Sequence, residues 1–340
     1  FPTEKQFANV EHAQKIAKVF LQQLLKNGTT TGFVFSSVHQ GCCNALFSAA
    51  SEIDMAIVAG KVCMDRNCPA DLQDCPDTAQ KDSAILIEKW HNTGRNRYAI
   101  TPRFAPTSSE AQLAALGELA TQYKDVFVQT HLSENVDEIA WVKTLFPKAS
   151  GYLDVYDKYN LVRPRAVFGH GIHLSSDEWQ RLGEAEATLA FCPTSNLFLG
   201  SGLFDLQTAK ENNVHVALAT DVGAGTSFSM LKTYGDAYKV SQLRQAPIDP
   251  IEGFYLMTQG AAVAHKLDDE IGNLNPNTVA DFIIVTPRYD ELMELRIKPN
   301  AEFDDVFFAL SILGDDRAIA ETWISGQCCY NKKETHYAMA

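Results

Sequence analysis

The sequence has 340 residues, of which 46% are hydrophobic and 21% are charged, and its formal net charge is -13. This length suffices for one large α/β barrel of about 250 residues and a smaller appendage. The acidic balance argues against nucleic acid or an anionic membrane as the main partner, and no apolar run approaches the roughly 18 residues that a membrane span needs. The eight cysteines suit neither a zinc ribbon nor a disulfide framework, so we expect free thiols in a reducing cytoplasm.

Hydrophobic periodicity predicts that helices and strands alternate over most of the chain. A helix begins near Val10, and Gly28 lies where a left-handed C-terminal cap would end it. Strands are expected at 29–35, 56–59, 98–101, 126–130, 166–169, 188–191 and 214–219. Helices are expected around 45–53, 85–90, 112–123, 136–146, 178, 206, 230–242 and 250–262. This alternation is typical of a parallel sheet with right-handed crossovers.

The predicted fold is therefore α/β, a (β/α)8 barrel of the TIM type that lacks its first strand in this sequence. Seven strands are recognised, and the first predicted element is the helix near Val10 instead of a strand. An open doubly wound sheet is the alternative, although no Gly-x-Gly-x-x-Gly fingerprint follows an early strand. After residue 265, the runs 280–285 and 323–327 predict a small β-sandwich appendage with a returning helix. We expect domains at 1–265 and 266–340.

Polar residues follow several predicted strands at their carboxyl ends, where barrel enzymes carry their active sites. His131 and Glu134 follow one such strand. A histidine there can ligate zinc, and a glutamate three residues later can move protons over the same site. The alternative is an incidental strand-end histidine with a solvated glutamate.

Two further strand ends carry His170 and Asp221. His170 lies between Gly169 and Gly171, which would let backbone or ligand approach closely, although a simple turn is the alternative. Asp221 follows an apolar strand and precedes two glycines, a setting that suits metal ligation and activation of a bound water. An aspartate that caps the following helix would fit this sequence equally well.

A fourth strand ends in Arg103 and Phe104, between Pro102 and Pro106. The guanidinium can hold a carbonyl oxygen or an anion, and the phenyl ring can stack on a planar ring. The two prolines stiffen the loop that carries them. A surface salt bridge beside a core phenylalanine is the alternative. The arrangement of all these residues at strand ends favours one common site.

Six segments resemble those of guanine deaminases, a family of metal-dependent hydrolases in the amidohydrolase superfamily. They are ITPRFAPT (100–107), THLSEN (130–135), GHGIHL (169–174), FCPTSNL (191–197), TDVGAG (220–225) and LGDDR (313–317). The resemblance covers essentially the whole chain, and the first and last segments are the more specific to guanine deaminases. It implies hydrolytic deamination of guanine to xanthine and ammonia by a zinc-activated hydroxide, as a step of guanine catabolism.

The resemblance also implies one bound zinc ion, with iron the less favoured metal, and His131 and Asp221 as ligands. The first strand of the family carries a His-x-His pair that supplies two more ligands, and this sequence contains no such pair. We expect those two histidines upstream of Phe1, so the activity of the chain by itself is an open question. Two protein ligands hold zinc poorly, because catalytic sites normally use three or more.

Catalytic roles are implied for Glu134, Asp221 and His170. Glu134 would carry protons between the water and the purine ring, Asp221 would take the proton of the water, and His170 would help to place the hydroxide and the leaving group. The residues implied to contact the purine substrate are Arg103, Phe104, His131, Glu134, His170 and Asp221. The family further implies a cytoplasmic homodimer.

Other functions share parts of this pattern. Amidohydrolases that act on other purines, pyrimidines or triazines also carry the His-x-x-Glu and Thr-Asp elements. An inactive, metal-free fragment or binding scaffold would fit the lack of a His-x-His pair. Hydrolysis through Cys192 as a nucleophile has less support, because nothing in the sequence places a base beside it.

Overall fold

The structure is a computed structural model that describes residues 1–334. These residues fall into two compact units. Unit 1 comprises residues 1–21 and 31–188, and unit 2 comprises residues 22–30 and those from 189 onward. The first long helix, α1 (Val10–Lys26), contributes to both units, and Gly28 follows it with φ of +78°, which confirms the predicted left-handed position.

Unit 1 consists of short strands that alternate with helices, as the periodicity predicts. Its strands are β1 (Thr31–Phe35), β2 (Ala56–Gly60), β3 (Val62–Cys63), β4 (Arg97–Pro102), β5 (Phe127–Leu132) and β6 (Ala166–His170). Its helices after α1 are α2 (Gln40–Glu52), α3 (Pro76–Trp90), α4 (Glu110–Gln122), α5 (Val136–Leu145), α6 (Tyr152–Asp157) and α7 (Ser176–Glu184). Single 3-10 turns are η1 (Glu4–Ala8), η2 (Ala70–Leu72) and η3 (Ala105–Thr107).

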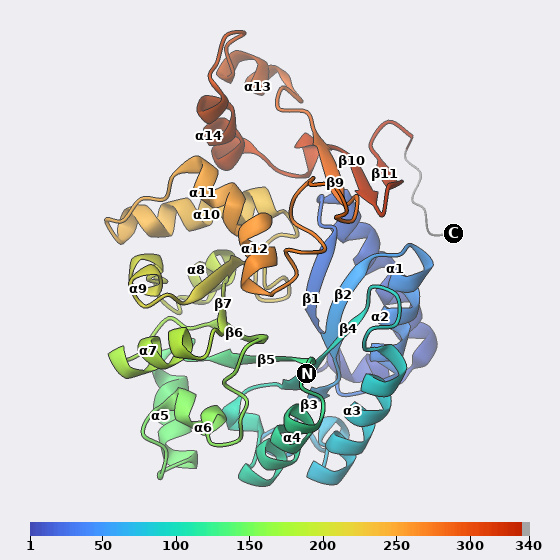
Figure 1. The fold of residues 1–340 in the computed structure, drawn as a ribbon, viewed down its shortest axis with the longest axis vertical. Coiled ribbons are helices and arrows are strands. Elements are labelled where there is room, and N and C mark those ends of the chain that lie inside the picture. The colour runs from blue at the N-terminus through green and yellow to red at the C-terminus, as the bar shows by residue number, and fades with distance from the viewer. Residues whose placement is uncertain (335–340) are drawn as a thin grey trace. The chain divides into compact units, whose positions relative to one another are not determined.

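The strands of unit 1 form a parallel sheet in the order β1, β2, β4, β5, β6, with β3 paired to β4. All five residues of β2 are buried, because α2, α3 and α4 pack along β2 and β4 (Figure 1). The buried amide of Gln129 on β5 donates to the carbonyl of Val34 at 2.9 Å and to the hydroxyl of Thr101 at 3.1 Å. This parallel sheet with covering helices confirms the predicted α/β class.

Unit 2 continues the alternation and ends in a small antiparallel sheet. Its barrel-type elements are β7 (Thr188–Phe191), α8 (Pro193–Leu199), α9 (Leu206–Glu211), β8 (His215–Leu218), α10 (Met230–Leu243), α11 (Pro250–Leu256) and α12 (Gln259–Ala264). They are followed by β9 (Phe282–Val285), α13 (Glu291–Arg296), α14 (Phe303–Leu313), η4 (Asp316–Ala318), β10 (Ile319–Ile324) and β11 (Gln327–Asn331). The Thr322 hydroxyl of β10 donates to the carbonyl of Leu25 at 2.7 Å, which ties the sheet to the end of α1.

Two predicted elements of unit 2 were wrong in detail. The strand expected at 323–327 is a hairpin, because Ser325 (φ 49°) and Gly326 (φ 77°) take left-handed conformations between β10 and β11. The helix expected at 250–262 is divided into α11 and α12, since Thr258 has a non-helical backbone. The appended sheet of β9, β10 and β11 confirms the predicted change to β structure in the C-terminal part.

A buried histidine in unit 2 predicts that the protein loses stability in mild acid. The side chain of His265 is 7% exposed and bonds the Ala261 carbonyl through Nδ1 at 2.6 Å. Burial, with a smaller contribution from His215, lowers the pKa of His265 to about 4. Below about pH 6.5 the imidazole is therefore protonated in the unfolded chain but stays neutral in the folded chain. The free energy of unfolding falls by up to about 3 kcal/mol between pH 6.5 and 4.

Urea unfolding at pH 7 and at pH 4.5 checks this expectation. His265→Leu should flatten the loss of unfolding free energy between the two pH values, whereas His12→Leu, at a half-buried position, should follow the wild-type dependence. Equal pH dependence in His265→Leu and the wild type would contradict the assignment.

Candidate active site

The structure places His131 in β5 with its imidazole held in one orientation. Its Nδ1 lies 2.7 Å from the carbonyl oxygen of Arg103, so Nδ1 carries the proton and donates. The neutral imidazole then has its lone pair on Nε2, the arrangement common in metal-ligating histidines. The rings of Phe35 and Phe104 lie 4.6 Å and 6.4 Å from the His131 ring, measured between centroids.

Glu134 and His170 meet His131 at the ends of β5 and β6. The rings of His131 and His170 stack at 5.5 Å with an interplanar angle of 24°. The Nε2 atom of His170 is 3.7 Å from a carboxylate oxygen of Glu134, and the His170 side chain is only 2% exposed. Three of the residues predicted from the sequence therefore form one cluster in unit 1, which brings a carboxylate and two imidazoles together.

Strained backbone marks the same strand ends. His170 has φ of +73°, Ser133 has φ of +47°, and in unit 2 Asp221 has φ of +46°. A left-handed conformation costs a non-glycine residue about 1–2 kcal/mol, and such strain concentrates at functional sites. In unit 1 the strain is held by backbone hydrogen bonds, since the amide of Gly171 donates to the carbonyl of Leu132 at 2.9 Å.

Arg103 and Phe104 lie on the loop that follows β4. The Arg103 amide donates to the carbonyl of Cys63 at 3.2 Å, and its Nη1 pairs with the Glu4 carboxylate at 2.9 Å. The side chain of Arg103 remains 34% exposed. The salt bridge expected under the alternative interpretation is therefore present. Within the described residues, the guanidinium of Arg103 donates hydrogen bonds only through Nη1. The guanidinium also lies over the Phe1 ring, 5.2 Å from its centroid.

Asp221 belongs to unit 2 and occupies a tight turn after β8. Its carbonyl accepts from the Gly225 amide at 2.5 Å, and a Cβ at residue 225 would lie 1.8 Å from the carbonyl oxygen of Thr220, so only glycine fits there. The Thr194 hydroxyl donates to the same Thr220 carbonyl at 3.0 Å and joins two of the motif segments. The N-cap of the next helix is Ser229, so the interpretation of Asp221 as a helix cap was wrong.

A complete metal site is not formed by the residues that the structure describes. No group of three or more histidine, cysteine, aspartate or glutamate side chains within 1–334 is placed to hold a metal ion. Catalytic zinc sites normally use three protein ligands. The donor atoms of His131 suit a metal by their hydrogen bonding, so the chain offers candidate ligands that fit zinc but not a full set.

Two of the buried cysteines, Cys63 and Cys192, offer no competing nucleophile. All eight are free thiols. Burial raises the pKa of Cys63 to about 11, so this thiol stays protonated at neutral pH. The Cys192 thiol is buried and donates to the carbonyl of Ala190 at 3.2 Å. This buried residue at the start of α8 contributes to packing. The alternative in which Cys192 is a nucleophile therefore gains no support.

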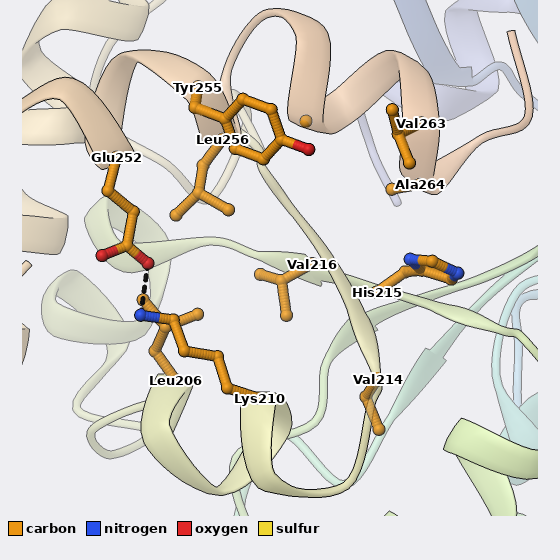
Figure 2. A pocket seen from close by; sticks show the side chains of 11 residues that line it. Leu206, Lys210, Val214, His215, Val216, Glu252, Tyr255, Leu256, Val263 and Ala264 are labelled. Carbon is orange, nitrogen blue, oxygen red and sulfur yellow. Dashed lines mark ion pairs between the residues drawn. The ribbon is translucent and has the colours of Figure 1, made fainter. Parts of the chain in front are cut away.

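A pocket of about 190 Å³ opens between α9, β8, α11 and α12 in unit 2. Figure 2 shows Lys210 and Glu252 paired across one end, with His215 at the other end and apolar residues such as Val216 and Leu256 between them. His215 begins β8, whereas Asp221 follows the end of that strand. The pocket is smaller than typical ligand sites of about 300–1,000 Å³ and lies at the amino end of the strand, so it is not the candidate site.

Two buried residues near the cluster were missed from the sequence. Glu138 accepts the backbone amide of Glu134 at 3.1 Å, and Tyr156 donates to the carbonyl of His131 at 2.9 Å. Glu138 lies in the first turn of α5, where a glutamate is an ordinary helix-start residue. No pattern in the sequence distinguishes this glutamate from one that is exposed to solvent. The same holds for Tyr156, which the sequence cannot distinguish from a tyrosine that only packs in the core.

Comparisons with known proteins agree in pointing to one family. The Amidohydrolase family profile matches residues 2–329. The guanine deaminase of Escherichia coli strain K12 is 49% identical over 98% of this chain and 76% of its own length. The solved structure of the E. coli guanine deaminase has a TM-score of 0.97 and covers 98% of this chain and 78% of that chain.

More distant structures share the fold as well. A guanine deaminase from C. acetobutylicum with bound guanine has 30% identity and a TM-score of 0.89, covering 97% of this chain and 78% of that chain. An adenosine deaminase from Xanthomonas campestris with bound zinc has 21% identity and a TM-score of 0.80, covering 97% and 71%, and this likeness concerns the fold alone. The matches confirm the predicted barrel-type α/β fold. Within 1–334, no helix has both the length and the apolar character needed to cross a bilayer.

Proposed function

The chain belongs to the guanine deaminase family of the amidohydrolases, and we propose on this basis that it hydrolyses guanine to xanthine and ammonia. The observation of the structure that carries the proposal is the cluster of His131, Glu134 and His170 at the ends of β5 and β6. A purine substrate is further supported by the guanine bound to the C. acetobutylicum relative.

The residues of the chain supply proton transfer and orientation. Hydrolysis requires that water attacks the ring carbon bearing the amino group, while protons reach the adjacent ring nitrogen and the departing amine. Glu134 carries those protons, a role supported by the position of its carboxylate 3.7 Å from Nε2 of His170. His170 helps to orient the attacking water. Arg103 holds the purine carbonyl and Phe104 lies beside the ring, so the correct carbon faces the water.

The metal that we propose is one zinc ion, with iron less favoured and with His131 and Asp221 among the ligands. When bound, zinc would supply a hydroxide at neutral pH, because it lowers the pKa of water from 15.7 to about 7. The carboxylate of Asp221 would accept a proton from the attacking water. Elemental analysis of the purified protein distinguishes this proposal from a metal-free binding scaffold, which would contain no stoichiometric zinc.

We extend the proposal to assembly, location and domains. Leu295, Phe303 and Ile312 on α13 and α14 are 82%, 68% and 53% exposed, and such apolar surface suits a homodimer contact. The free thiols suit a cytoplasmic location and guanine catabolism there. We also propose that residues 1–265 and 266–340 are the barrel and appendage domains. Light scattering that gives the mass of one chain would exclude the dimer.

An ammonia-release assay with guanine, adenine and cytosine as separate substrates tests the function. We expect kcat/KM for guanine to exceed that for the other bases by at least about 100-fold, because a site that bonds a purine carbonyl rejects adenine, which has no carbonyl, and cytosine lacks the second ring of a purine. Preference for adenine or cytosine would favour another amidohydrolase activity.

Arg103→Ala should lower kcat/KM for guanine by roughly 10- to 160-fold, because a hydrogen bond to a charged group contributes about 1.5–3 kcal/mol. Steady-state kinetics of ammonia release measure the effect. Arg97→Ala, at the opposite end of the same strand, is the matched control and should keep the wild-type kinetics. Unchanged guanine preference in Arg103→Ala would remove Arg103 from the substrate site.

A further inference from the structure

The hydroxyl of Tyr156 on α6 joins two loops of the candidate site. It donates to the carbonyl of His131 at 2.9 Å, and it accepts from the backbone amide of Ala105 at 2.8 Å and from the hydroxyl of Thr130 at 3.1 Å. A phenolic oxygen has one hydrogen and accepts through its lone pairs, so these contacts use its full capacity. The tyrosine is fully buried. One oxygen atom therefore fixes the strand end of His131 and the loop after Arg103 at the same time.

The carboxylate of Glu138 holds a third segment, the backbone at Glu134, in the same way. One of its oxygens accepts from the backbone amide of Glu134 at 3.1 Å, and the other accepts from the hydroxyl of Tyr152 at 2.5 Å. Asn135 caps α5 by accepting from the Glu138 amide at 2.9 Å, which fixes the start of the helix. The backbone of Glu134 follows Ser133 in its left-handed conformation, so this segment needs an external support.

Tyr152 and Tyr156 lie one helical turn apart on α6, and their rings stack at 5.8 Å. A single short helix thus supports all three segments that carry His131, Glu134 and Arg103. We propose that Tyr156 and the Tyr152–Glu138 pair are positioning residues, which fix the geometry of the proton shuttle and of the substrate loop without touching the substrate. The test of this inference by guanine turnover rests on the proposed function, whereas its test by hydrogen exchange does not.

The burial of these groups indicates that the hydrogen bonds are required and not incidental. Glu138 is 8% exposed, and burial raises the pKa of its carboxyl group, while the hydrogen bonds from Tyr152 and from the Glu134 amide act in the opposite direction. A buried carboxylate that lost either donor would be left unsatisfied, and the network would then rearrange. Active-site geometry is sensitive to such rearrangement, because a displacement of about 1 Å can cost about 100-fold in rate.

Tyr156→Phe removes only the hydroxyl and tests the kinetic consequence. We expect kcat for guanine to fall by about 10- to 100-fold while KM stays within about threefold of wild type, because orientation and not binding is lost. Tyr98→Phe is the matched control, since Tyr98 is also fully buried in unit 1 and accepts a backbone amide, that of Lys61, at 3.2 Å. A kcat in Tyr156→Phe equal to that of Tyr98→Phe would overturn the proposal.

Two substitutions of Glu138 separate positioning from simple loss of stability. In Glu138→Gln the amide oxygen can still accept from the Glu134 amide, and the NH2 group can donate to the Tyr152 hydroxyl, which then accepts instead of donating, so kcat should stay within about threefold of wild type. Glu138→Leu removes both contacts and should lower kcat by at least about tenfold. An equal loss in both variants would overturn the positioning role.

Hydrogen exchange at backbone amides provides a readout that does not depend on guanine turnover. The Ala105 amide should exchange at least about tenfold faster in Tyr156→Phe than in Tyr98→Phe, and the Glu134 amide should do the same in Glu138→Leu. If the wild-type protein releases no ammonia from guanine, the proposed function fails while the exchange data still decide the positioning role. Unchanged exchange at the amides of Ala105 and Glu134 would overturn the positioning role.

Discussion

Replacing Glu134 with glutamine is expected to lower kcat for guanine by about 10²–10⁴-fold, the usual loss when a proton-transfer group is removed. Glutamine keeps the size of the side chain and its place beside His170 but cannot take up and release a proton. Binding should change little, because we propose that Arg103 and Phe104 orient the purine. Steady-state ammonia release gives kcat and KM separately, and a fall confined to kcat is the expected pattern.

Glu110→Gln is the control for this substitution, since Glu110 lies in the exposed first turn of α4 and outside the candidate site. The control should retain wild-type kcat. Full turnover in Glu134→Gln would exclude Glu134 as the proton carrier and would transfer that role to His170 or Asp221.

Asp221→Asn is expected to cause a loss of similar size, about 10²–10⁴-fold in kcat, because the negative charge that takes up the proton is removed. Asparagine suits this position structurally, since Asp221 has φ of +46° and asparagine tolerates the left-handed conformation better than most residues. The variant should therefore fold with nearly wild-type stability. Thermal unfolding and zinc content, measured beside kcat, separate a chemical defect from a folding defect.

Asp54→Asn provides a matched control for the backbone effect. Asp54 also has a left-handed conformation, with φ of +53°, and it is exposed in unit 1. It should keep wild-type turnover and zinc content. If Asp221→Asn retains both of these properties as well, Asp221 is neither a ligand nor a base.

Much of the fold follows from local pattern in the sequence. The helix α1 and the strand β7 occur where periodicity and β-branched residues predict them, because burial of one helix face or of a whole parallel strand leaves a clear record in the order of residues. Strand ends are equally visible, since an apolar run stops at a polar residue. The cluster of His131, Glu134 and His170 was predictable for this reason: parallel strands place their carboxyl ends together.

Several features that the sequence did not reveal depend on contacts between residues that are distant along the chain. The hairpin was missed although the pair Ser325 and Gly326 is itself a turn signal, and the break at Thr258 was missed because the helix resumes directly after it in α12. The pairing of Arg103 with Glu4 joins residues 99 positions apart.

The network of Glu138, Tyr152 and Tyr156 likewise arises only when α6 packs against the ends of β5 and α5. The sequence by itself determined which residues could do the chemistry, because apolar periodicity and strand ends are local properties. The tertiary structure decided which buried polar groups hold those residues in place, because each buried donor and acceptor must find its partner in space and not in sequence.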